Sequence, residues 1–145
     1  VHFAAPMIRE YSAADFLSLY EYSADKSTKI VSHYYADGSE GFVNGLYDLE
    51  EDFPDTTDVI FGGISAVTEI TDDSEEGKSL LVFCDDTAKS WVTFMTLHYK
   101  KITMVCLSDA SEAQLSEINP DNYDQVIFAY STANFAKEDF SRLAG

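Results

Sequence analysis

Five short apolar segments recur along the chain without the regular polar alternation that marks a half-exposed strand. Each is rich in Val, Ile, Leu and Phe, which is typical of strands covered on both faces, as in parallel sheets. The predicted strands span residues 29–33, 58–64, 79–84, 102–107 and 125–130.

Apolar residues at helical spacing predict helices before and between these strands. The helices are expected over residues 13–22, 40–49, 87–98, 111–118 and 134–143. The fourth begins with Ser111 followed by Gln114, which is the spacing of a capping box. Residues 66–77 are polar and acidic, and we expect a loop there.

Alternating strands and helices predict an α/β fold with three layers: a mainly parallel five-stranded sheet with helices on both faces. A chain of 145 residues is expected to form one domain, residues 1–145, in which residues 1–28 are an N-terminal helical extension. No apolar run approaches the roughly 18 residues that a membrane-spanning helix needs. The start of the chain lacks the basic and apolar regions of a secretory signal, so no retained signal peptide is expected.

Both cysteines lie inside strongly apolar segments. Cys84 ends the third predicted strand and Cys106 lies in the fourth. Buried thiols are favoured over a disulfide in such positions. Reduced thiols indicate a reducing compartment, and we expect the protein to be cytoplasmic.

Negative charge is concentrated in the first half of the chain. Thirteen carboxylates and no Lys or Arg lie between Lys29 and Lys78. Such a surface repels nucleic acid and anionic membranes and attracts basic protein surfaces. The alternative is a solvated surface that serves solubility alone. The predicted binding residues are two acidic clusters and two nearby tyrosines: Asp48, Glu50, Glu51, Asp52, Asp55 and Asp58; Asp72, Asp73, Glu75 and Glu76; Tyr34 and Tyr35.

A second group of side chains follows the predicted strands where they end. Ligands of open α/β sheets bind at the carboxyl ends of strands, where this sequence places one His and four Asp: His33, Asp37, Asp85, Asp86 and Asp109. An imidazole and carboxylates gathered there could bind a divalent metal such as Mn²⁺ or Mg²⁺, and the predicted ligands are His33, Asp37, Asp85 and Asp109. Capping of helix N-termini is the alternative role for the aspartates.

The segment 30–46 resembles the start of the DHH-family phosphoesterases, in which a strand runs into His-x-Asp-x-Asp-Gly and a helix of small residues. His33, Asp37 and Gly38 match, whereas Tyr35 stands at the first Asp of that motif. The segment 80–86 is similar to the strand that delivers a metal-binding Asp in that family. The place of the family's Asp-His-His motif is occupied by Asp109, Ala110 and Ser111.

The resemblance covers residues 29–112 and implies a metal site reduced to His33, Asp37, Asp85 or Asp86, and Asp109. A two-metal phosphoesterase needs a dense ligand set, and three ligand positions are lost here. The resemblance therefore implies a catalytically inactive copy of such a fold.

The residues support three hypotheses about function. The first is a non-catalytic acidic module that binds a basic protein surface and needs no cofactor. A sharper version is mimicry of a nucleic-acid backbone, as in small viral inhibitors. The second is a divalent-metal-dependent phosphoesterase acting on a nucleotide or short oligonucleotide. The third is a structural or assembly subunit, and the oligomeric state stays open.

Overall fold

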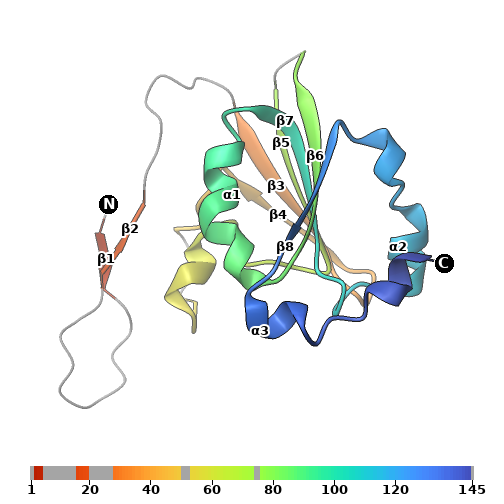
Figure 1. The fold of residues 1–145 in the computed structure, drawn as a ribbon. Coiled ribbons are helices and arrows are strands. Elements are labelled where there is room, and N and C mark those ends of the chain that lie inside the picture. Colours follow the sequence, from red (N-terminus) through yellow and green to blue (C-terminus); the bar gives the residue numbers. More distant parts are fainter. Residues whose placement is uncertain (1, 5–15, 20–27, 50–52, 74–75, 145) are drawn as a thin grey trace.

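The computed structural model describes residues 2–4, 16–19, 28–49, 53–73 and 76–144. Six strands form one sheet in the order β4-β3-β5-β7-β6-β8 (Figure 1). The three pairs from β4 to β7 are antiparallel, and the two pairs that join β7, β6 and β8 are parallel. The strands are β3 (Lys29–Tyr34), β4 (Glu40–Asn44), β5 (Val67–Asp72), β6 (Lys78–Cys84), β7 (Tyr99–Val105) and β8 (Gln125–Ala129).

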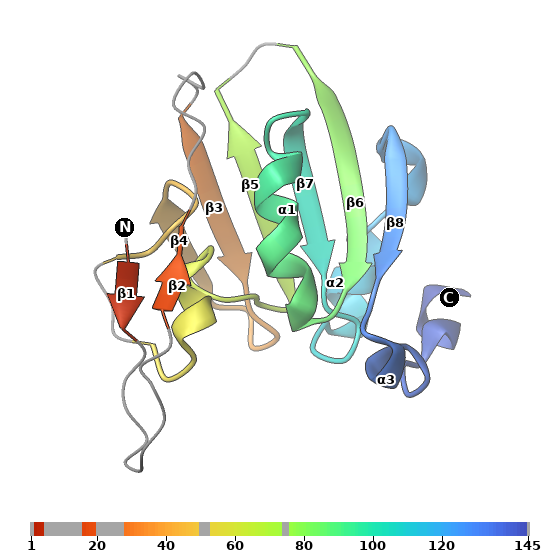
Figure 2. The ribbon, with the colours of Figure 1, turned by 60° about the vertical axis from the view of Figure 1, so that its left-hand side comes forward.

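Helices cover both faces of the sheet, but sparsely. Helix α1 (Lys89–Met95) lies on one face, where Val92 packs against strand residues such as Val82 and Met104. Helix α2 (Glu112–Glu117) lies on the other, where Leu115 packs against Leu81 and its neighbours. The short helix α3 (Thr132–Phe135) and the 3-10 turn η4 (Phe140–Ala144) follow β8 near one end of the sheet (Figure 2).

The fold is therefore a mixed α/β sheet, and the predicted mainly parallel five-stranded sheet in three layers is wrong. The error comes from residues 66–77, which contain β5 in place of the expected loop. The polar residues of β5 concealed it, yet Thr68 is fully buried and its hydroxyl contacts other buried polar groups. A polar strand at the centre of the sheet is stable because its polar atoms have hydrogen-bonding partners.

Two other predicted elements are also wrong. Residues 40–49 contain the edge strand β4 in place of the expected helix. The apolar residues at helical spacing were misleading, because one of them, Phe42, is 73% exposed. Residues 58–64 form no strand: the 3-10 turn η1 (Thr56–Val59) leads into a turn in which Phe61, Gly62 and Gly63 all have positive φ. Left-handed backbone at three successive residues cannot continue a strand.

The N-terminal helical extension is wrong wherever the chain is described. Strands β1 (His2–Ala4) and β2 (Phe16–Ser18) pair antiparallel as a separate two-stranded sheet. The remaining residues of the predicted helix over 13–22 lie outside the described residues, apart from Leu19.

Four predicted strands and two helices are confirmed. Strands β3, β6, β7 and β8 coincide closely with the predicted segments, and α1 lies inside 87–98. Helix α2 begins at a complete capping box, in which the Ser111 hydroxyl accepts from Gln114 N and the Gln114 side chain accepts from Ser111 N. The helix predicted over 134–143 is replaced by α3 and η4. Among the described residues, no helix has the length and apolar character needed to cross a membrane.

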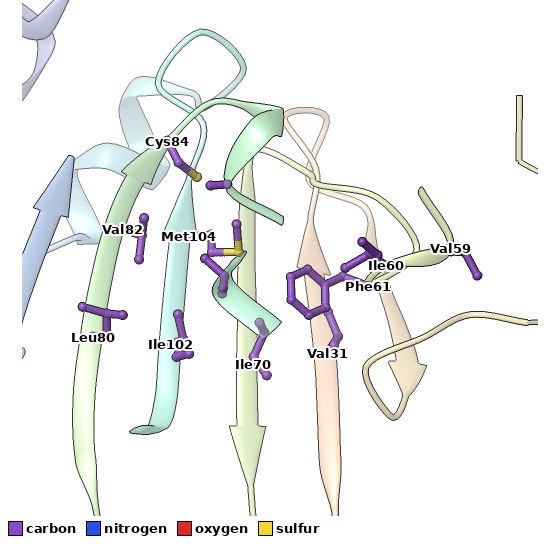
Figure 3. Packing of buried hydrophobic residues seen from close by; sticks show 12 residues of the cluster. Val31, Val59, Ile60, Phe61, Ile70, Leu80, Val82, Cys84, Ile102 and Met104 are labelled. Carbon is purple, nitrogen blue, oxygen red and sulfur yellow. The ribbon is translucent and has the colours of Figure 1, made fainter. Parts of the chain in front are cut away.

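The main core lies between α1 and the central strands. Figure 3 shows Phe61 reaching across to Val31 and Ile70, so that the turn after η1 closes one side of this core. The Phe61 carbonyl oxygen of the same turn also contacts His33, which lies on the same buried face of β3 as Val31. The core thus positions the residues at the end of the sheet where β3, β6, β7 and β8 finish.

Candidate functional site

Strands β3, β6, β7 and β8 all end at the same end of the sheet, because β3 and β7 are both antiparallel to β5 while β7, β6 and β8 are parallel (Figure 2). This carboxyl-terminal end is where open α/β sheets place their ligand sites. The turns that follow the strands bring several carboxylates there. The candidate site consists of these carboxylates and of the groups that hold them.

Asp85 is buried, and its carboxylate accepts hydrogen bonds from two different turns. Its Oδ1 accepts hydrogen bonds from Thr87 N at 3.0 Å and from the Thr87 hydroxyl at 2.5 Å. Its Oδ2 accepts from Ser131 N at 2.9 Å and from Asn134 Nδ2 at 2.8 Å. Burial alone would raise the pKa of this carboxyl, but the hydrogen bonds from Thr87, Ser131 and Asn134 outweigh it and hold the pKa well below its usual range. Asp85 therefore joins the end of β6 to the start of α3 as an ionised acceptor.

Lys89 is a buried cation between two carboxylates. Its Nζ lies 2.5 Å from Asp58 Oδ1 and 2.8 Å from Asp86 Oδ1, and its side chain is 4% exposed. Burial lowers the pKa of Lys89, but hydrogen bonds to Asp58 and Asp86 raise it above the ordinary value. The ammonium group stays charged and joins η1 to the start of α1.

A cluster of three carboxylates surrounds this lysine. Ligand atoms of Asp55, Asp58 and Asp86 lie within 4.8 Å of one another, and they form the one such group found among the described residues. Asp55 Oδ1 already accepts from Thr57 N and the Thr57 hydroxyl, which holds its pKa below the usual range. The Lys89 ammonium pairs with Asp58 and Asp86 and neutralises part of the negative charge of the cluster.

His33 is buried beneath the turn after η1. Its Nε2 lies 2.8 Å from the Phe61 carbonyl oxygen, which can only accept, so Nε2 carries the proton. Its Nδ1 lies 3.4 Å from the Thr68 hydroxyl and 3.3 Å from the Ser65 hydroxyl. Burial lowers the pKa of His33, against a smaller opposing effect of the Phe61 bond. His33 thus supports the left-handed turn as a neutral side chain.

The predicted metal ligands are not brought together as a group of the kind formed by the cluster around Lys89. Asp37 is exposed in the turn between β3 and β4, where its carboxylate accepts from Ser39 N and the Ser39 hydroxyl. Asp109 is exposed after β7. His33 and Asp85 are buried and engaged in the contacts described above. Asp85 has the alternative role, because it caps the 3-10 helix η2 (Asp86–Ala88), whereas Asp37 caps the turn between β3 and β4.

The described members of the two predicted acidic clusters lie at opposite ends of the sheet. Asp55 and Asp58 lie near the carboxyl-terminal end through their contacts around Lys89, and Asp48 N donates to the Val59 carbonyl in the same region. Asp72 is the last residue of β5 and Asp73 follows it, at the end of the sheet where β3 begins. Glu76 is exposed just before β6. Glu50, Glu51, Asp52 and Glu75 lie outside the described residues.

Lysines accompany the second cluster. Lys29 pairs with Asp72 at 3.2 Å, and Lys101 pairs with Glu69 at 2.7 Å. Lys78 begins β6, and Lys100 lies beside Gly77. This end of the sheet therefore carries charge of both signs, which the linear sequence conceals because the lysines come from different strands.

The two tyrosines diverge as alternating strand positions do. Tyr34 packs against the α2-side core, whereas Tyr35 is exposed, with its ring stacked 6.0 Å from that of His33. The thiols are both free: Cys84 is buried, and Cys106 is half-buried with Sγ 3.3 Å from the Ser108 hydroxyl. Burial raises the pKa of both thiols, that of Cys106 to about 11, so neither position indicates a reactive thiolate.

The sequence analysis assigned no role in the site to Lys89, Asn134 or Ser131. Lys89 is the one cation between Lys78 and Lys100, and that isolation is a signal that could have marked it. The contact of Asn134 with Asp85 spans 49 residues, and no local spacing reveals it.

Comparisons with known proteins identify solved structures of similar fold, but they assign this chain to no family. No family model matches the chain, and no curated protein sequence matches it. Among solved structures, Bacillus cereus PatB1 with a sulfonyl adduct has a TM-score of 0.67 at 18% identity, over 92% of this chain and 46% of that one. A second PatB1 structure has a TM-score of 0.59 at 17% identity, over 92% and 47%. A DHHW family protein from Eubacterium siraeum has a TM-score of 0.63 at 14% identity, over 82% and 40%.

At these identities the similarity concerns the fold alone, and this chain spans less than half the length of those proteins. Their fold differs from that of the DHH-family phosphoesterases, so the resemblance inferred from the segment 29–112 is wrong. The matched pattern was short: His33 and Asp37 bind the turns beside them, and both strands next to β3 are antiparallel to it.

Proposed function

We propose that this protein is an acidic, non-catalytic interaction module that binds a basic protein surface through the carboxyl-terminal end of its sheet. The surface consists of six carboxylates from five separate turns and strands, and we name it the acidic rim. Its members are Asp37, Glu40, Asp55, Asp58, Asp86 and Asp109.

The separation of charge along the sheet carries this proposal. Lys29, Lys78, Lys100 and Lys101 belong to the opposite end, where β3, β6 and β7 begin. Lys89 and Arg142 lie at the rim end of the sheet: Lys89 is buried and bound by two carboxylates, and Arg142 donates to the Leu107 and Ala110 carbonyl oxygens and pairs with Glu112. Asp37, Glu40 and Asp109 are exposed, and the ion pairs found among the described residues do not include them. A cationic partner would therefore meet mainly negative charge at the rim and charge of both signs at the other end.

A titration with a nona-arginine peptide tests this location. The rim variant Asp37→Asn, Asp55→Asn, Asp109→Asn retains side-chain oxygens that can still cap the local turns. The matched control Asp73→Asn, Glu76→Gln, Glu117→Gln removes the same number of exposed carboxylates away from the rim. Both triple variants change the net charge of −17 equally.

We expect the rim variant to weaken peptide binding about tenfold and the control about twofold or less, measured by calorimetry at low salt. Binding by the wild type should weaken steeply as salt rises, because exposed charges are screened. Equal losses in the two variants would show that net charge, not the rim, attracts the peptide. Binding indifferent to salt would also contradict the proposal.

A further inference from the structure

The edge strand β8 is uncharged in a strongly acidic protein. Its residues are Gln125, Val126, Ile127, Phe128 and Ala129. It pairs with β6 on one side, and on its other side no described strand pairs with it. Proteins commonly protect such edges with charged residues, Pro or bulges, because an open edge can pair with another strand. The opposite edge strand, β4, carries Glu40.

Exposed apolar side chains lie along and beside this edge. Phe128 is 51% exposed and Val126 is 37% exposed. The Phe128 ring lies 5.8 Å from that of Phe140, which lies 5.0 Å from that of Phe135. Phe135 and Leu143 are exposed as well, so the apolar surface continues from β8 onto α3 and η4. A contiguous patch of this kind marks an interaction surface more often than scattered apolar residues do.

We propose that β8 pairs antiparallel with β8 of a second copy of this chain, giving a twofold dimer with one continuous sheet. A register centred on Ile127 places Val126 of each copy opposite Phe128 of the other. Val126 and Phe128 lie on the same face of the strand, because side chains two residues apart do so. The pairing therefore covers both exposed side chains with aromatic and β-branched contacts, which stabilise cross-strand pairs.

The charge distribution favours a second copy over a basic partner at this edge. The strand offers no carboxylate that would attract a cationic protein, unlike the acidic rim. Two copies that each carry a net charge of −17 repel one another, and an uncharged edge is where they can approach most closely. Salt screens that repulsion, so dimerisation should strengthen as salt rises. Binding at the acidic rim should respond to salt in the opposite direction, so the two proposals can fail separately.

Light scattering coupled to size-exclusion chromatography, over a range of protein and salt concentrations, tests the dimer. We expect the wild type to approach twice the chain mass of 16.2 kDa as either concentration rises. Val126→Glu should remain monomeric under the same conditions, because it places a carboxylate in the strand pair. The matched control Phe94→Glu adds the same charge at an exposed apolar position on α1 and should still dimerise.

Hydrogen exchange of the wild type locates the contact without a variant, which matters if Val126→Glu fails to fold. Amides within Gln125–Ala129 should exchange more slowly at concentrations where the dimer forms. A wild type that stays monomeric throughout, or a dimer whose added protection lies at β4 and not at β8, would overturn the proposal.

Discussion

Lys89 Nζ lies 2.5 Å from Asp58 Oδ1, and this ion pair joins α1 to η1 across 31 residues of sequence. The pair explains why three carboxylates can lie close together despite their mutual repulsion. The buried ammonium group of Lys89 neutralises part of their negative charge. It also fixes η1, which leads into the turn that closes the main core.

Lys89→Met is expected to destabilise the protein by about 1–3 kcal/mol, because it leaves Asp58 and Asp86 close together without their cation. The cost stays moderate because the Asp86 side chain is 61% exposed and can be hydrated. Urea unfolding at neutral pH measures the effect. Lys78→Met, which removes an exposed lysine, should change stability by less than about 0.5 kcal/mol. An equal effect of the two substitutions would contradict the structural role of Lys89.

Asp85→Asn is expected to cost about 2 kcal/mol at neutral pH, because an amide cannot accept all the hydrogen bonds that reach the carboxylate. The folded-state pKa of Asp85 lies below that of the unfolded chain, so its stabilisation is present above the unfolded value. That stabilisation is lost as pH falls through about 4 toward the folded pKa.

Urea midpoints between pH 7 and pH 3 check this dependence. The wild type should lose more stability than Asp85→Asn over the acidic part of the range, so that their curves converge. Parallel curves would mean that Asp85 does not titrate with folding.

His33→Gln is expected to reduce the pH dependence of stability between neutral pH and about pH 5.5, above the range where most carboxylates titrate. Burial lowers the pKa of His33 in the folded protein below its value of about 6.5 in the unfolded chain. At a pH just below that unfolded value, the unfolded chain therefore binds more protons than the folded protein does. Wild-type stability therefore falls as pH decreases through this window. Imidazole NMR titration provides a direct reading, and a His33 pKa at or above the ordinary value would contradict the expected burial effect.

Phe61→Gly sets two effects against each other. Glycine relieves the left-handed backbone at φ 65°, a gain of about 1 kcal/mol. Losing a fully buried phenyl ring costs about 3–5 kcal/mol. We expect a net loss of about 2–4 kcal/mol in thermal or urea unfolding, and a smaller loss for Phe61→Leu, which retains apolar volume. A stabilised Phe61→Gly variant would show that backbone strain, not packing, dominates at this turn.

Local sequence patterns correctly predicted the strands β3, β6, β7 and β8 and the helices α1 and α2. The apolar segments that became β3, β6 and β7 supply buried core residues, and the Ser111–Gln114 spacing started α2 as expected. The segment of β8 also formed a strand, although its Val126 and Phe128 are exposed. The pattern failed at β5, where Thr68 and Glu69 make a central strand look like a loop. It failed again at β4, whose exposed Phe42 imitates the apolar face of a helix.

The sequence predicted the types of residue in the candidate site but not the contacts between them. Aspartates after strands were expected, and Asp85 and Asp86 do follow β6. Their roles depend on Asn134, Ser131 and Lys89, whose contacts join turns far apart in sequence. The short match to the DHH pattern carried no information about these contacts, since it compared residue types along one strand.

By itself the sequence determined the excess of acidic residues, the strongly apolar strands and the helix-capping signals, because these depend on composition and near neighbours. Tertiary structure alone decided strand order and direction, the placement of four lysines at one end of the sheet, and the burial of Lys89 between carboxylates. Those properties depend on which distant segments pair, and pairing is set by how the whole chain buries its apolar surface while keeping its polar atoms bonded.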